Sequence, residues 1–117
     1  MKEALRIAID EAFLQASIAT GVQDHQKAFR WLERAHILTQ RMPLLHARSH
    51  WLMLQLGWRT RDFRELAGQI PRILAALLFS RIWVPIGNTG RARVSALAPM
   101  PIPADLQQLL RETEPMP

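Results

Sequence analysis

Four side chains that commonly bind metals lie close together in the middle of the chain. Glu33 and His36 are three residues apart, and His46 and His50 are four apart. Residues at these spacings share one face of a helix, so each pair can point two ligand atoms in the same direction. The chain has no cysteine, so a metal would be held by nitrogen and oxygen alone. The spacing predicts a metal site with Glu33, His36, His46 and His50 as its ligands.

The residues between the two pairs predict a tight helical hairpin. A helix over about Asp24–Arg41 is followed by one that begins at Pro43, and proline is favoured in the first turn of a helix. At a rise of ~1.5 Å per residue, His36 lies roughly 9 Å from the turn, His50 roughly 12 Å and Glu33 roughly 13 Å. His46 lies about one turn from it. We therefore expect the four side chains to meet along one side of the hairpin.

Imidazole nitrogen and carboxylate oxygen together suit a divalent metal of the zinc or iron class, with one position left open. The predicted function is metal handling or a small metalloenzyme, and no residue is assigned a catalytic role. One alternative is that the same groups hydrogen-bond to one another without a metal. Glu33 lies furthest round its helix from the apolar stripe, so it could orient the histidines instead of binding the ion.

The hydrophobic pattern around this hairpin predicts an all-α fold. About four helices, over roughly 2–20, 24–41, 43–57 and 60–82, would form two antiparallel hairpins, arranged as a four-helix bundle or like a tetratricopeptide pair. Pro71 should kink the fourth helix or begin a new one, and the apolar run Ile73–Phe79 should be buried. We treat 1–117 as a single domain.

The composition changes after residue 82. Residues 83–117 should form an extended segment that packs on the helices, with a small hairpin or ordered loop first. A proline-rich arm follows over Pro99–Pro103, and a short helix could form over Asp105–Arg111.

Charge and hydropathy narrow the choice of location and partners. The first residues are amphipathic and acidic, unlike a secretory leader, and no apolar run approaches the ~20 residues of a membrane span. We expect a cytoplasmic protein without a membrane partner.

The net charge is +5, but the arginines are scattered, so nucleic-acid binding ranks last. A homodimer is a further expectation, and the alternative function is a helical-repeat module that binds a protein or peptide without metal.

Four segments carry a resemblance to a known family: Leu32–Leu38, His46–Leu54, Pro85–Gly90 and Pro99–Pro103. Through them the chain resembles, over nearly its whole length, a family of small bacterial proteins known as domain of unknown function 3703. The resemblance brings no established activity. It implies that the Gly87–Gly90 turn and the proline arm belong to one functional unit with the histidines. We therefore predict that the arm folds back over the hairpin and covers the site.

Overall fold

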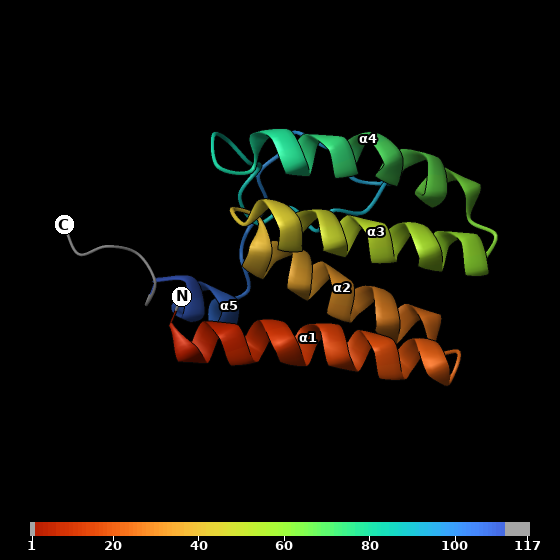
Figure 1. The fold of residues 1–117 in the computed structure, drawn as a ribbon, viewed down its shortest axis with the longest axis horizontal. Helices are drawn as coiled ribbons and strands as arrows, with labels where there is room; N and C mark the ends of the chain where they lie inside the picture. The colour runs from red at the N-terminus through yellow and green to blue at the C-terminus, as the bar shows by residue number, and fades with distance from the viewer. Residues whose placement is uncertain (1, 112–117) are drawn as a thin grey trace.

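The computed structural model describes residues 2–111 and is all-α over that range. Its five helices are α1 (Glu3–Gly21), α2 (His25–Thr39), α3 (Pro43–Arg59), α4 (Phe63–Phe79) and α5 (Ala104–Arg111). Helices α1 to α4 are antiparallel, and each packs against the next (Figure 1). The two expected hairpins are present, and the short α5 raises the count to five. Residue 1 and residues 112–117, the end of the predicted extended segment, lie outside the described part of the chain.

The helix ends follow from local chemistry. The Asp24 carboxylate accepts a hydrogen bond from the Lys27 backbone N–H at 3.2 Å, and the Asp62 carboxylate accepts one from the Glu65 N–H at 3.1 Å. Each therefore caps the N-terminus of the helix that follows. Pro43 lies in the first turn of α3, as predicted. Helix α4 continues through Pro71, so no new helix begins there.

The apolar core lies mainly between α1 and α2. Both helices bury small, aliphatic and aromatic side chains, and α3 and α5 add three more apolar side chains. The largest of these side chains are Leu5, Ile9, Phe13, Phe29, Leu32, Ile37, Leu38, Met53, Leu56 and Leu106. In α1, the buried face carries Leu5, Ile9 and Phe13, and Ile7 and Ile18 on the other side are exposed. Burial of this apolar surface is the dominant favourable contribution to folding here.

Helix α4 contradicts the expectation of a buried apolar helix. Within the run over residues 73–79, Leu74 is 59% exposed and Leu78 is 67% exposed, whereas Ala76 is buried. The side of α4 that packs on α3 instead carries Glu65 and Gln69, both fully buried. A count of apolar residues does not reveal which face of a helix is covered, and here polar groups occupy the covered face. No helix among the described residues is long and apolar enough to cross a membrane.

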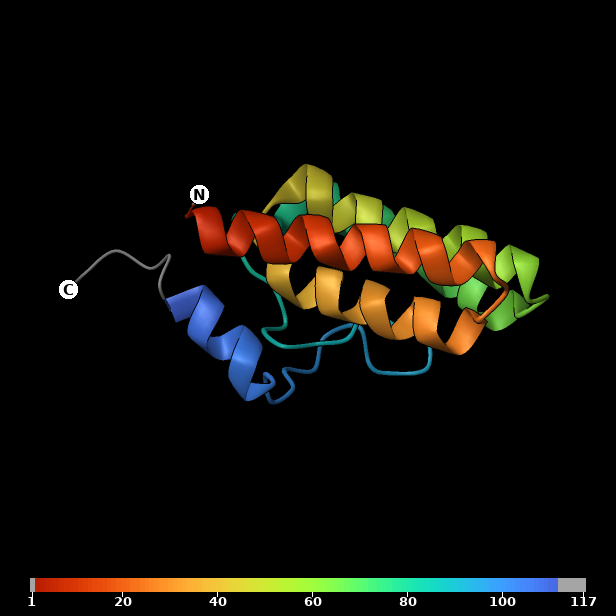
Figure 2. The same cartoon turned by 90° about the horizontal axis from the view of Figure 1, so that it is seen from below.

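The segment from residue 80 to residue 103 joins α4 to α5 as irregular loops without strands, and it runs back along α2 (Figure 2). Gln40, directly after α2, holds it in place. The Gln40 side-chain amide donates to the Pro85 carbonyl at 2.9 Å, and its carbonyl accepts from the Gly87 N–H at 2.8 Å. These bonds place the Gly87–Gly90 turn against the C-terminal half of α2.

Candidate metal centre

Three histidines meet in the interior between α2 and α3. The Nε2 atoms of His36 and His46 are 2.9 Å apart, those of His36 and His50 are 3.1 Å apart, and those of His46 and His50 are 3.2 Å apart. Four ligands held tetrahedrally at 2.0–2.1 Å from zinc are separated by about 3.3 Å. The three nitrogens are thus spaced nearly as they would be around one ion.

The other ring nitrogen of each histidine faces an oxygen that accepts its proton. His36 Nδ1 lies 2.7 Å from the Asn88 backbone carbonyl, and His50 Nδ1 lies 2.6 Å from the Gln69 side-chain carbonyl. His46 Nδ1 lies 2.7 Å from the Ser80 hydroxyl, which donates its own hydrogen to the Ala76 carbonyl. Each Nδ1 is therefore the donor, and each Nε2 is left with a lone pair.

Burial keeps these lone pairs free of protons. It lowers the pKa of His46 to about 4, that of His50 to about 3 and that of His36 well below its usual value. At neutral pH, three unprotonated Nε2 atoms therefore face one another at about hydrogen-bond distance with no hydrogen between them. A cation among them would satisfy all three lone pairs. The described residues whose ligand atoms gather here are these three histidines.

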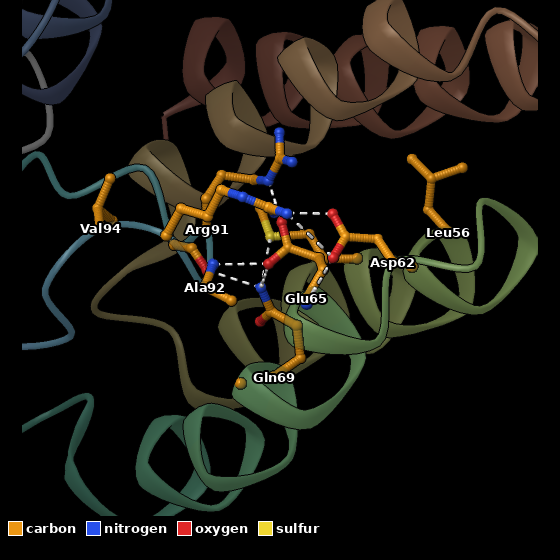
Figure 3. A network of polar contacts seen from close by, with 12 residues as sticks. Leu56, Asp62, Glu65, Gln69, Arg91, Ala92 and Val94 are labelled. Atoms are coloured by element: carbon orange, nitrogen blue, oxygen red, sulfur yellow. Dashed lines mark hydrogen bonds and ion pairs between the residues drawn. The ribbon is translucent and has the colours of Figure 1, made fainter.

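Gln69, the partner of His50, is itself held by a second layer of polar groups. The Gln69 amide N–H groups donate to the Glu65 carboxylate at 3.1 Å and to the Gly90 carbonyl at 2.8 Å, so its carbonyl is the end that faces His50. Glu65 is fully buried, forms an ion pair with Arg91 and accepts from the Ala92 N–H at 2.6 Å (Figure 3). Groups that orient a metal-bound histidine in this way typically strengthen metal binding 10-fold to 100-fold.

The Gly87–Gly90 turn supports His36. The Asn88 side chain donates to the Ser95 and Ala98 carbonyls and accepts from the Gly90 N–H, and this holds its backbone carbonyl at His36. Gly90 has a φ of +83°, and a Cβ there would lie 2.7 Å from the His36 ring. Only glycine fits this position, because both the backbone conformation and the space exclude a side chain.

A cavity of about 390 Å³ lies beside the centre and is lined by all three histidines. Apolar side chains form most of its remaining wall, and they come from α4 and from residues 83–97. The proline arm over residues 99–103 is not among the lining residues. Instead the arm lies beside the Gly87–Gly90 turn. The Met100 N–H donates to the carbonyl of Ile86, directly before the turn, at 2.9 Å. The arm thus supports the turn. The prediction that it covers the histidines is wrong.

Glu33, the fourth predicted ligand, lies outside the histidine group. Three residues of a helix turn through about 300°, so Glu33 points roughly 60° away from His36. It is half-buried and lines a separate cavity with Arg30 and Thr89. The role of orienting the histidines, which the sequence allowed for Glu33, belongs to groups that sequence reasoning missed: Gln69, Ser80, Asn88 and, behind them, Glu65.

The comparisons with known proteins give a family but no activity. No curated protein and no solved structure matches the chain. A family model described as "Protein of unknown function (DUF3703)" matches residues 3–110. Since that match covers nearly the whole chain, the protein belongs to the DUF3703 family.

Proposed function

We propose that the protein binds one divalent transition-metal ion through the Nε2 atoms of His36, His46 and His50. The observation that carries the proposal is the convergence of three lone pairs within 3.2 Å, with every Nδ1 committed to an oxygen acceptor. Histidines that only hydrogen-bonded to one another would need a hydrogen between each pair of nitrogens. The oxygens of Asn88, Ser80 and Gln69 support metal binding, because they fix the tautomer that a metal ligand requires.

The donor set favours zinc over ferrous iron. Non-haem iron sites typically combine two histidines with a carboxylate, whereas three neutral imidazoles with an open fourth position are typical of catalytic zinc. No carboxylate of residues 2–111 joins the histidine group. The open position lies beside a cavity, which suits a small metalloenzyme or a carrier whose ion accepts a further ligand.

Metal analysis of the untagged protein tests the proposal. We expect close to one equivalent of zinc, and replacement of both His46 and His50 by alanine should reduce it to less than about a third. His25→Ala is the matched control: His25 is the remaining histidine of the chain, begins α2 and lies outside the group, so this variant should keep its zinc.

Circular dichroism of each variant verifies that it still folds. An untagged wild-type protein that stays free of zinc, iron and manganese, even after incubation with each ion, would rule out the proposal. Equal loss of metal in the His25 variant would show that the bound ion is not at this centre.

One observation favours the alternative of a protein-binding module. Leu44, Trp51 and Trp58 are more than half exposed and follow one another at seven-residue intervals on α3. They lie apart from the histidines, so an interaction surface here would not replace the metal centre. Sedimentation analysis of the wild-type protein and of Trp51→Gln would detect self-association through this stripe.

A further inference from the structure

The cavity beside the histidines has one polar wall and otherwise apolar walls. Phe79, Trp83 and Leu97 lie among its lining residues and are also partly open to solvent, so they form a rim through which a ligand can enter. Its volume of about 390 Å³ is near the lower end of the usual range for small-molecule sites, about 300–1,000 Å³. The size therefore suits a compact ligand with a hydrocarbon body.

Arg72 is the charged residue in this lining, apart from the histidines. Its guanidinium donates to the backbone carbonyls of Gly68 at 2.8 Å and Val94 at 2.9 Å, so it is held in place from two sides. No carboxylate among residues 2–111 forms an ion pair with it. Burial lowers the pKa of Arg72, and the charge of Glu65, which forms no ion pair with it, offsets this shift only in part.

Once a divalent cation is bound, the charges that line the cavity, those of the ion and of Arg72, are therefore both positive. Three neutral imidazoles do not compensate a divalent cation, and the half-buried Arg72 adds a further positive charge. The buried carboxylate of Glu65, which acts on Arg72 only through its charge, already forms an ion pair with Arg91. An anion is the ligand that balances this charge, and the apolar walls select one with an apolar body.

The geometry points to a compact organic anion, of the monocarboxylate class, as the ligand of this centre. Its charged head would bind at the open metal position beside Arg72, and its hydrocarbon body would occupy the space between Phe79, Trp83 and Leu97. This inference rests on the proposed metal site and adds to it the chemical class of the molecule that the site receives.

A cobalt-substituted protein provides the test, because the visible spectrum of Co²⁺ reports a change of ligand at the metal. We would titrate it with acetate, butanoate, hexanoate and benzoate, and with hexanamide as the uncharged comparison. We expect each carboxylate to change the spectrum and affinity to rise about threefold to fourfold per added methylene until the cavity is full. Hexanamide should bind at least about tenfold more weakly than hexanoate.

Two substitutions separate the head from the body of the ligand. Arg72→Met should weaken every carboxylate about tenfold, and Arg72→Lys should restore much of this loss. Arg81→Met is the matched control, because it removes an exposed arginine just beyond α4 that does not line the cavity. Ala75→Leu narrows the cavity and should weaken hexanoate while leaving acetate unchanged.

The outcomes distinguish the two proposals. Failure of the folded protein to take up cobalt or zinc would overturn the metal site itself. Normal cobalt uptake with equal affinity for acetate and hexanoate would leave the metal site standing and overturn the assignment of an apolar anion. The same conclusion would follow if Arg72→Met bound hexanoate as tightly as the wild-type protein.

Discussion

The two helical hairpins are held together by opposite kinds of contact. Between α1 and α2, the buried side chains are almost all apolar, and they include Leu32 and Leu38. Between α3 and α4, the buried groups include Glu65 and Gln69 on α4 and Ser80 directly after it, while most of the large aliphatic side chains of α4 are exposed. The chain has thus placed a polar network where a second apolar core would normally lie.

This difference shows what each half contributes. An apolar interface tolerates small shifts, because dispersion and burial do not depend on precise angles. A buried polar network is stable only when every donor and acceptor has its partner, so it positions side chains closely. The α1–α2 half therefore supplies stability, and the α3–α4 half supplies the geometry of the histidine centre.

The largest expected effect comes from removing Glu65. Glu65→Ala leaves Arg91, which is 24% exposed, without its counter-ion and frees the Gln69 amide. We expect the free energy of unfolding to fall by about 3 kcal/mol, the lower end for breaking a buried pair. Metal affinity should also fall, by about 10-fold to 100-fold. Urea unfolding and a zinc-chelator competition measure the two effects.

Leu32→Ala is the matched control in the other half. It should cost a similar 2–5 kcal/mol, because it opens a cavity in the apolar core. Its affinity for zinc should remain that of the wild-type protein. If both variants lost zinc affinity equally, general destabilisation would explain the loss and the contrast between the two halves would fail.

The second prediction concerns where a bound metal adds stability. At a free zinc concentration 100 times the dissociation constant, amide hydrogen exchange should gain about 2.7 kcal/mol of protection in α3, α4 and the Gly87–Gly90 turn. These segments carry two of the proposed ligands, His46 and His50, and two of the three orienting groups, Gln69 and Asn88; the third, Ser80, directly follows α4. Helix α1 packs mainly on α2 and should change little. Equal protection of α1 would show instead that the two halves unfold as one unit.

The smallest expected effect concerns the cap of α4. Asp62 caps this helix and forms an ion pair with Arg93 at 2.7 Å, so Asp62→Ala should cost about 1 kcal/mol at pH 7. The Arg93 hydrogen bond lowers the pKa of Asp62, so the carboxylate stabilises the fold above the unfolded pKa of about 3.9. This contribution is lost as the pH falls through the lower folded-state pKa.

Asp24→Ala removes the equivalent cap of α2, and Asp24 forms no ion pair within residues 2–111. The α4 variant should therefore lose a few tenths of a kcal/mol more than the α2 variant, the value of an exposed ion pair. Urea unfolding of both variants at pH 7 and near pH 3 measures the difference. An equal cost at pH 7 would contradict the role given to Arg93.

Much of the fold could be predicted because its signals are local. Asp24, Asp62 and Pro43 mark helix starts through side-chain and ring chemistry that acts within one turn. The three histidines could be found for a similar reason, since His46 and His50 share a helix face and His36 lies just across a short turn. Glu33 was misplaced because a spacing of three brings residues near each other on a helix but does not point them the same way.

The orienting groups could not be found in this manner, because they come from distant parts of the chain. Asn88 acts through its backbone carbonyl, which no residue type reveals. One signal was nonetheless present: Glu65, Gln69 and Ala76 in α4 and Ser80 directly after it recur at near-helical intervals. Polar and small residues at this spacing on an otherwise apolar helix mark the covered face. A count of leucines does not show this face.

The order of these groups along the chain has a consequence for synthesis. All three proposed ligands lie within residues 36–50, whereas every group that fixes their tautomers lies within residues 69–88. A growing chain therefore carries its three imidazoles well before the groups that orient them. Asn88 is the last of the three orienting groups to be synthesised, and its own side chain is held only once Ser95 and Ala98 have followed.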